Sequence, residues 1–123
     1  MNKAIISIGS NEDREENLSV CRTMLNEEFT GIFYSPASLS TPYGEHYRND
    51  FLNQLACIYT NRNRDEIVPI LKEIEYMMGR KAEDKMKGIV RIDIDLVIWN
   101  NETLRPNEMN RSYIKDLLVH VPE

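Results

Sequence analysis

The sequence of 123 residues has few of the side chains that build disulfide scaffolds or zinc sites. Its only cysteines are Cys21 and Cys57, and its only histidines are His46 and His120. Two cysteines without CxxC spacing are too few for a disulfide framework, and reduced, buried thiols are the simplest interpretation. A structural zinc site needs about four nitrogen or sulfur ligands close together. The sequence therefore argues against both kinds of site.

Long apolar runs and an excess of positive charge are also missing. No run approaches the roughly 18 apolar residues of a membrane span. Met1 to Lys3 lead directly into a strand-like segment without the pattern of a signal peptide, so we expect a cytoplasmic protein that does not bind membranes. The net charge of −5 argues against nucleic acid as a general partner. With 41% hydrophobic and 28% charged residues, the chain is typical of one folded domain over residues 1–123.

The spacing of apolar residues predicts four strands and two long helices. Short runs rich in apolar and β-branched residues predict strands over 3–8, 30–39, 51–60 and 91–99. Helical spacing predicts helices over 13–29 and 65–78, the second of which is closed by Gly79, and a short helix over 113–121. The order β-α-β-β-α-β predicts an α+β, ferredoxin-like fold, in which an antiparallel sheet carries two helices on one face.

One predicted strand alternates acids with apolar residues. In Ile92-Asp93-Ile94-Asp95-Leu96, residues two apart point to the same face. The apolar residues are therefore expected under the helices, while Asp93 and Asp95 share the other face. Magnesium prefers one or two carboxylates together with waters and phosphate oxygens, which suits such a pair. A solvated strand face that carries two acids also fits the spacing, although aspartate is disfavoured within strands.

The polar ranges 41–50 and 81–88 are expected to be loops. The second loop and its flanks bring cations to the acidic strand: Arg80, Lys81, Lys85, Lys87 and Arg91. Such cations suit a metal–polyphosphate complex, but an ordinary charged surface loop has the same pattern. After the first loop, Phe51 and Asn53 share a strand face, where a planar heterocycle could stack on the ring and bond the amide. A core phenylalanine beside a turn-proximal asparagine fits this pattern too.

Taken together, these segments resemble the family of 6-hydroxymethyl-7,8-dihydropterin pyrophosphokinases, enzymes of folate biosynthesis. The resemblance runs from about residue 4 to residue 104 and is carried, in the family's order, by Ile8-Gly9-Ser10-Asn11 with Glu16-Asn17-Leu18, Ser40-Thr41-Pro42 with Phe51-Leu52-Asn53, Ile74-Glu75 with Gly79-Arg80, and Ile92-Asp93-Ile94-Asp95-Leu96. It implies a ferredoxin-like, pyrophosphokinase-like domain that transfers pyrophosphate from ATP to the hydroxymethyl group of the pterin and releases AMP. ATP is then the co-substrate, and two Mg²⁺ ions are the expected cofactor.

The resemblance also implies roles for the matching residues. Asp93 and Asp95 are expected to hold the metal and to act in catalysis with Arg80 and Arg91. The pterin is expected to contact Thr41, Pro42, Tyr43, Phe51, Asn53 and Tyr113. The nucleotide is expected to contact Lys72, Glu75, Arg80, Lys87 and Arg111. Small molecules are thus the expected partners of a monomer or weak dimer.

Several departures from the family's pattern concern ATP. Val90 stands where the family has an arginine, and Arg91 follows one residue later, with its side chain expected on the opposite strand face. Lys87 replaces a loop tryptophan, the family's proline-histidine loop is missing, and we expect a shortened C-terminal portion. These departures keep two alternatives open. One is a non-catalytic pterin- or nucleotide-binding protein on the same fold, and the other is an unrelated ferredoxin-like interaction domain.

Overall fold

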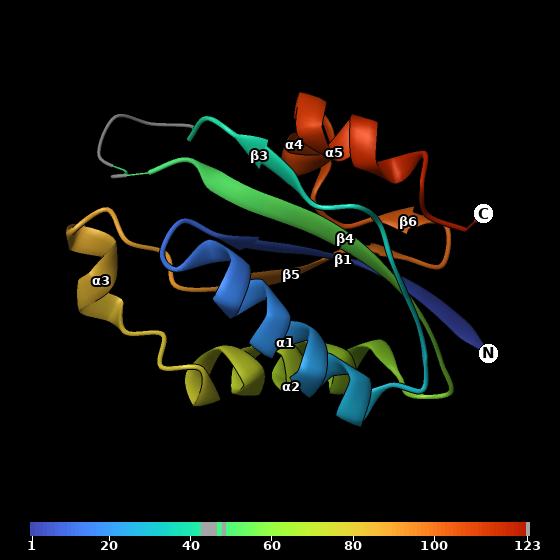
Figure 1. The fold of residues 1–123 in the computed structure, drawn as a ribbon. Coiled ribbons are helices and arrows are strands. Elements are labelled where there is room, and N and C mark those ends of the chain that lie inside the picture. Colours follow the sequence, from blue (N-terminus) through green and yellow to red (C-terminus); the bar gives the residue numbers. More distant parts are fainter. Residues whose placement is uncertain (43–46, 48, 123) are drawn as a thin grey trace.

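A computed structural model describes residues 1–42, 47 and 49–122 of the chain (Figure 1). The strands are β1 (Asn2–Ser10), β2 (Gly31–Tyr34), β3 (Ser38–Ser40), β4 (Phe51–Thr60), β5 (Asp93–Trp99) and β6 (Glu102–Thr103). They form one sheet in the order β2-β4-β1-β5-β6, with β3 also paired to β4, and all of these pairings are antiparallel. The helices are α1 (Arg14–Glu28), α2 (Arg64–Met77), α3 (Ala82–Met86), α4 (Pro106–Met109) and α5 (Ser112–Leu118). The predicted α+β, ferredoxin-like fold is confirmed.

The two long helices, α1 and α2, cover the same face of the sheet (Figure 1). The apolar stripe of α2 is buried, with Ile67, Leu71 and Ile74 at most 1% exposed. These side chains pack with Ile6 and Ile94 of the central strands in the main core. Burying an aliphatic side chain of this size contributes about 1.5–3 kcal/mol. This face is therefore the main source of hydrophobic stabilisation, as the helical spacing predicted.

The opposite face carries the short helices α4 and α5 (Figure 1). The short helix predicted over 113–121 is confirmed as α5, whereas α4 was not predicted. At one end of this face a second core cluster forms under α5, where Ile114 and Leu117 pack with Leu55, Cys57 and Val97. At the other end the sheet is not covered in this way, and α3 lies beyond it (Figure 1). Over the described residues, the structure contains no helix with the length and apolar character of a membrane span.

Two predicted elements differ from the structure. The strand expected over 30–39 is split into β2 and β3, because Ser35 and Pro36 interrupt it. There the Ser35 hydroxyl accepts a hydrogen bond from the Leu55 N–H at 2.9 Å, while the Ser35 N–H donates to the Leu55 carbonyl. The charged range 81–88, expected to be a loop, contains α3. Gly79, in contrast, has the positive φ of 89° that its predicted place at the end of α2 requires.

Strand β5 has a free edge over five of its seven residues, because β6 pairs only with Ile98 and Trp99. Side chains from α2 and its C-terminal end close this edge. The Ile94 N–H donates to Glu75 Oε2 at 2.7 Å, and Lys72 donates to the Ile94 carbonyl at 3.3 Å. Buried backbone groups without a partner are costly, so these contacts both satisfy the strand and fix charged side chains beside it.

Candidate active site

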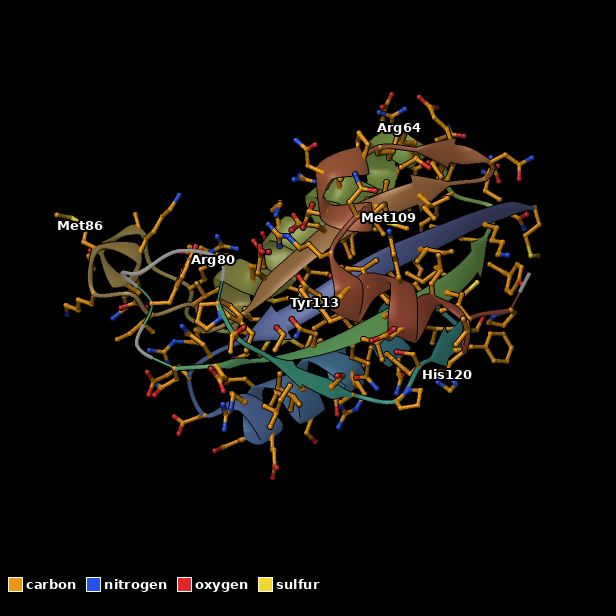
Figure 2. All side chains as sticks on the ribbon, turned by 90° about the horizontal axis from the view of Figure 1, so that it is seen from above. Arg64, Arg80, Met86, Met109, Tyr113 and His120 are labelled. Atoms are coloured by element: carbon orange, nitrogen blue, oxygen red, sulfur yellow. The ribbon has the colours of Figure 1, made fainter. Side chains whose placement is uncertain are left out.

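A cavity of about 380 Å³ opens over the sheet between α5 and the segment around α3. Its walls come from β1, β4 and β5, from the segment around α3, and from α4 and α5. Figure 2 looks onto this face, with Arg80 at the end of α2 and Tyr113 on α5. The cavity brings together nine of the predicted site residues: Pro42, Phe51, Asn53, Arg80, Arg91, Asp93, Asp95, Arg111 and Tyr113.

The floor of the cleft is a row of three paired residues across the sheet. Gly9 of β1 pairs with Asn53 of β4 on one side and with Asp93 of β5 on the other. A Cβ added at Gly9 would lie 3.4 Å from Asn53 Oδ1 and 3.7 Å from the Phe51 ring. Glycine therefore leaves open the space between the polar amide and the acidic pair, where a ligand could approach the backbone.

The acidic pair lies on the cleft side of β5, while Ile92, Ile94 and Leu96 are buried in the main core. The Asp93 side chain is 40% exposed, whereas that of Asp95 is only 10% exposed. Burial, together with the negative charges of Asp93 and Glu108, raises the pKa of Asp95 to about 6. The predicted alternation of faces is confirmed, and it places a partly desolvated carboxylate in the cleft.

Arg80 joins the acidic pair to α2. Its guanidinium lies 2.9 Å from Asp93 Oδ1 and 3.0 Å from Glu75 Oε2, and it also donates to the Ile92 carbonyl. Burial alone would lower the pKa of Arg80, but the hydrogen bond to Asp93 and the charges of Glu75 and Asp93 raise it. Arg80 is thus a fixed cation at the edge of the cleft, and the buried carboxylate of Glu75 positions it.

Two further cations contact Asp95. Lys72 Nζ and Arg105 lie 3.5 Å each from Asp95 Oδ1. Lys72 also contacts Glu75 at 3.2 Å, and Arg105 contacts Glu108 at 3.5 Å. Lys72 and Arg105 also line a second cavity of about 300 Å³ that adjoins Asp95 along the free edge of β5. Negative and positive side chains therefore alternate along the edge of the cleft beside β5. This arrangement is suited to a metal with a polyphosphate.

Asp93 and Asp95 offer the hard oxygen donors that Mg²⁺ prefers. Among the described residues, no group of three or more histidines, cysteines, aspartates or glutamates lies close enough to hold a metal ion by itself. Mg²⁺ is usually held by one or two carboxylates, with waters and substrate phosphates completing its shell. A pair of carboxylates that faces an open, cation-rimmed cleft fits this mode of binding.

The wall opposite the acids is aromatic and amide-lined. The Phe51 and Tyr47 rings meet edge to face with centroids 5.3 Å apart. The Asn53 amide nitrogen donates to Ser40 Oγ at 2.7 Å and to the Ser38 carbonyl at 3.2 Å. These bonds to β3 fix the plane of the amide and turn its oxygen toward Gly9. The wall therefore offers a flat apolar face beside an oriented hydrogen-bond acceptor.

Arg91 and Val90 both line the cleft, which corrects the expectation that they lie on opposite strand faces. The strand predicted from residue 91 begins only at Asp93, so the alternation of a strand does not apply to the two residues before it. Arg91 Nη2 lies 4.0 Å from Asp84 Oδ2 on α3. Asn11 fixes this segment, because its side chain accepts from the Val90 N–H and donates to the Gly88 carbonyl.

Four of the remaining predicted residues lie elsewhere. Thr41 and Lys87 are exposed and do not line the cleft, and Lys87 is the C-terminal cap of α3. Glu75 is buried behind Arg80, and Lys72 borders the second cavity. The fifth, Tyr43, falls outside the described residues.

Sequence reasoning missed several residues that the fold brings to the cleft: Tyr47, Asp84, Arg105 and Glu108. Arg105 and Glu108 belong to the chain around α4, which lies between the strand predicted over 91–99 and the helix predicted over 113–121 and contacts β5. The spacing of Arg105 and Glu108, three apart beside Pro106, was the only local signal of a helical turn there.

The fold and cleft define a ferredoxin-like α+β protein whose sheet presents an acidic pair, clustered cations and an aromatic wall. The family model for 7,8-dihydro-6-hydroxymethylpterin-pyrophosphokinase matches residues 5–123, so the chain belongs to this family. It is 28% identical over 111 residues to the 2-amino-4-hydroxy-6-hydroxymethyldihydropteridine pyrophosphokinase of Bacillus subtilis (strain 168). This match covers 88% of the chain and 66% of that relative, so the chain spans just under two thirds of the length of the curated relative.

Proposed function

We propose that this chain transfers the terminal pyrophosphate of ATP to the hydroxyl group of 6-hydroxymethyl-7,8-dihydropterin and releases AMP. The observation that carries the proposal is one cleft in which the acidic pair of β5 faces the aromatic and amide wall of β4 across Gly9. Membership of the pyrophosphokinase family supports the same reaction. Such a cleft would hold the acceptor and the polyphosphate side by side, which this transfer requires.

In the proposed reaction the pterin hydroxyl oxygen attacks the β-phosphorus of ATP. The bond from that phosphorus to the oxygen that bridges it to the α-phosphorus breaks, the hydroxyl proton is lost, and AMP leaves. Phe51 would stack on the pterin ring and Asn53 would bond its edge, which orients the hydroxyl group toward β5. This transfer needs positioning and charge neutralisation more than covalent help.

Asp93 and Asp95 would hold Mg²⁺, and we propose that the enzyme depends on two such ions. When bound, Mg²⁺ neutralises phosphate charge and holds attacking and leaving oxygens in place. Arg80 supplies a fixed positive charge next to Asp93, and Arg91 and Arg111 line the same cleft. We further propose that the protein works in the cytoplasm on small molecules, as a monomer or weak dimer, without nucleic acid or membrane partners.

Release of AMP tests the proposal. Purified protein with the pterin, ATP and Mg²⁺ should form AMP in equal amount to the pterin diphosphate. Omission of the pterin or chelation of the metal should stop product formation. No AMP from the wild type, together with no change on Asp95→Ala, would reject the proposal.

A non-catalytic ligand-binding function is the second candidate. It is favoured by Val90, which lacks the charge of the family's arginine, and by the two cations that pair with Asp95. Calorimetry that detects binding of pterin and an unreactive ATP analogue, in a protein that forms no AMP, would support this function instead.

A further inference from the structure

Two cations share one oxygen of the buried acid in the cleft. Lys72 Nζ and Arg105 Nη2 each lie 3.5 Å from Asp95 Oδ1. Charge-assisted hydrogen bonds are usually about 2.7–2.9 Å long, so both contacts are loose ion pairs. The Asp95 side chain is only 10% exposed, so solvent screens its charge less than that of a surface acid.

The two cations differ in how firmly they are held. Lys72 is anchored twice more, by Glu75 at 3.2 Å and by the Ile94 carbonyl at 3.3 Å. Arg105 is 50% exposed, and its other partner is Glu108 at 3.5 Å. The Glu108 Oε2 atom is buried and has no hydrogen-bond partner within the described part of the chain. Arg105 is therefore held by fewer and longer contacts than Lys72, which is fixed along the free edge of β5.

We propose that Arg105 is an exchangeable counter-ion of Asp95, which leaves the carboxylate when Mg²⁺ coordinates it and turns to the phosphates of the nucleotide. The inference rests on the proposed function, because it assumes the metal at Asp95. Mg²⁺ binds carboxylate oxygens at about 2.0–2.1 Å, so a guanidinium near the same oxygen opposes its binding. A polyphosphate in the cleft offers the planar guanidinium a stronger partner, with two parallel hydrogen bonds.

Arg105 is well placed for this exchange. It caps the N-terminal end of α4, a four-residue helix that has no buried residues, and its side chain lines both the cleft and the second cavity. Glu108, one helical turn later, keeps the guanidinium within reach of Asp95.

Metal binding without nucleotide tests the exchange directly. The protein is titrated with Mn²⁺ alone, and the free ion is counted by electron paramagnetic resonance, with Mg²⁺ as competitor. Arg105→Gln should bind Mn²⁺ about fivefold to tenfold more tightly than the wild type, because the competing charge is removed. The same variant should bind an unreactive ATP analogue with Mg²⁺ several-fold more weakly, because a phosphate contact is lost.

Arg64→Gln is the matched control. Arg64 begins α2 and borders the second cavity, but its ion pair is with Glu102 at 3.6 Å (Figure 2). The control should leave Mn²⁺ affinity close to that of the wild type. Unchanged or weaker Mn²⁺ binding by Arg105→Gln, or an equal gain in Arg64→Gln, would overturn the exchange.

The metal titration requires no turnover, so its outcome is separate from that of the AMP assay. Tighter Mn²⁺ binding in Arg105→Gln would support the exchange even in a protein that forms no AMP. The gain should vanish when Asp95→Asn is added to Arg105→Gln, and a gain that persists would place the competing charge at another site.

Discussion

The two faces of the sheet use the same strands for different purposes. On the face under α1 and α2, the inward side chains are apolar and closely packed, with Ile6, Leu71 and Ile94 at most 1% exposed. On the other face the same strands present Gly9, Asn53, Asp93 and Asp95 to an open cleft. Hydrophobic burial favours the packing on the helix face. The cleft face instead contains a buried carboxylate, which is costly, and space that no side chain fills.

Strand β5 shows the difference within a few residues. Ile94 and Leu96 are buried under the helices, whereas Asp93 and Asp95, between and beside them, face the cleft. Folding alone explains the first pair. The second pair adds repulsion and desolvation, so its presence is better explained by a ligand than by stability.

The helix face should be the more sensitive to truncation. Leu71→Ala removes a side chain that is 1% exposed, and it should lower the free energy of unfolding by about 2–5 kcal/mol. Leu39→Ala on β3, where the leucine is 58% exposed, is the control and should change stability by less than about 0.5 kcal/mol. Urea denaturation measures both. Equal losses would mean that the helix face is not the dominant core.

The cleft face should gain stability when its buried charge is removed. Folding raises the pKa of Asp95 from an ordinary 3.8 to about 6. The contribution of this carboxyl group to the free energy of unfolding is therefore full below pH 3.8, where the group is protonated, and is lost as the pH rises through 6. Asp95→Asn avoids this loss. In chelator it should be more stable than the wild type at pH 7, by on the order of 1–2 kcal/mol.

The pH dependence checks the sign of this effect. The stability difference between Asp95→Asn and the wild type should shrink as the pH falls from 7 toward 4. A stability difference that is constant over this range, or an asparagine variant that is less stable than the wild type at pH 7, would contradict a raised pKa of Asp95.

Substitution of two glycines distinguishes a residue that leaves room for a ligand from one that is required by packing. Gly9→Ala places a methyl group in the cleft at ordinary contact distance from Asn53, so it should fold normally but bind pterin several-fold to about tenfold more weakly. In Gly31→Ala the new Cβ would lie 3.1 Å from the Tyr59 carbonyl oxygen. That variant should lose stability and keep its pterin affinity. Calorimetry and thermal melting distinguish the two, and the reverse pattern would refute the position of the pterin.

The reactivity of the two cysteines measures how well each face of the sheet is shielded from solvent. Burial raises the pKa of Cys21, on the helix face, to about 12, and burial also raises the pKa of Cys57 in the α5 cluster. Since only the thiolate reacts, neither should be labelled by a disulfide reagent at pH 8 until the protein is unfolded. Rapid labelling of Cys57 in the native protein would show that the cluster under α5 opens.

Local patterns predicted the helix face well. The stripe on α2, the alternation in β5 and the positive φ of Gly79 all follow from the spacing of a few neighbouring residues. These features depend on hydrophobic periodicity and on the freedom of glycine, both of which can be read locally.

The cleft could be predicted only in part, because its walls come from distant segments. The acidic pair and the Phe51–Asn53 wall were found, but Arg105 and Glu108 reach Asp95 through a chain reversal that no local pattern specifies. Helix α3 was missed because its five residues are mostly charged and carry no apolar stripe. Contacts between segments far apart in the sequence, such as those of α4 with β5, accompany these positions, and local periodicity does not encode them.

The most direct test of the central claim compares Asp95→Asn with the wild type for AMP release and thermal stability in the same preparation. The cleft acid is proposed to serve chemistry rather than folding. We predict that the variant remains folded and at least as stable in chelator, while AMP release falls by about a hundredfold or more. A variant that releases AMP at the rate of the wild type would contradict the claim.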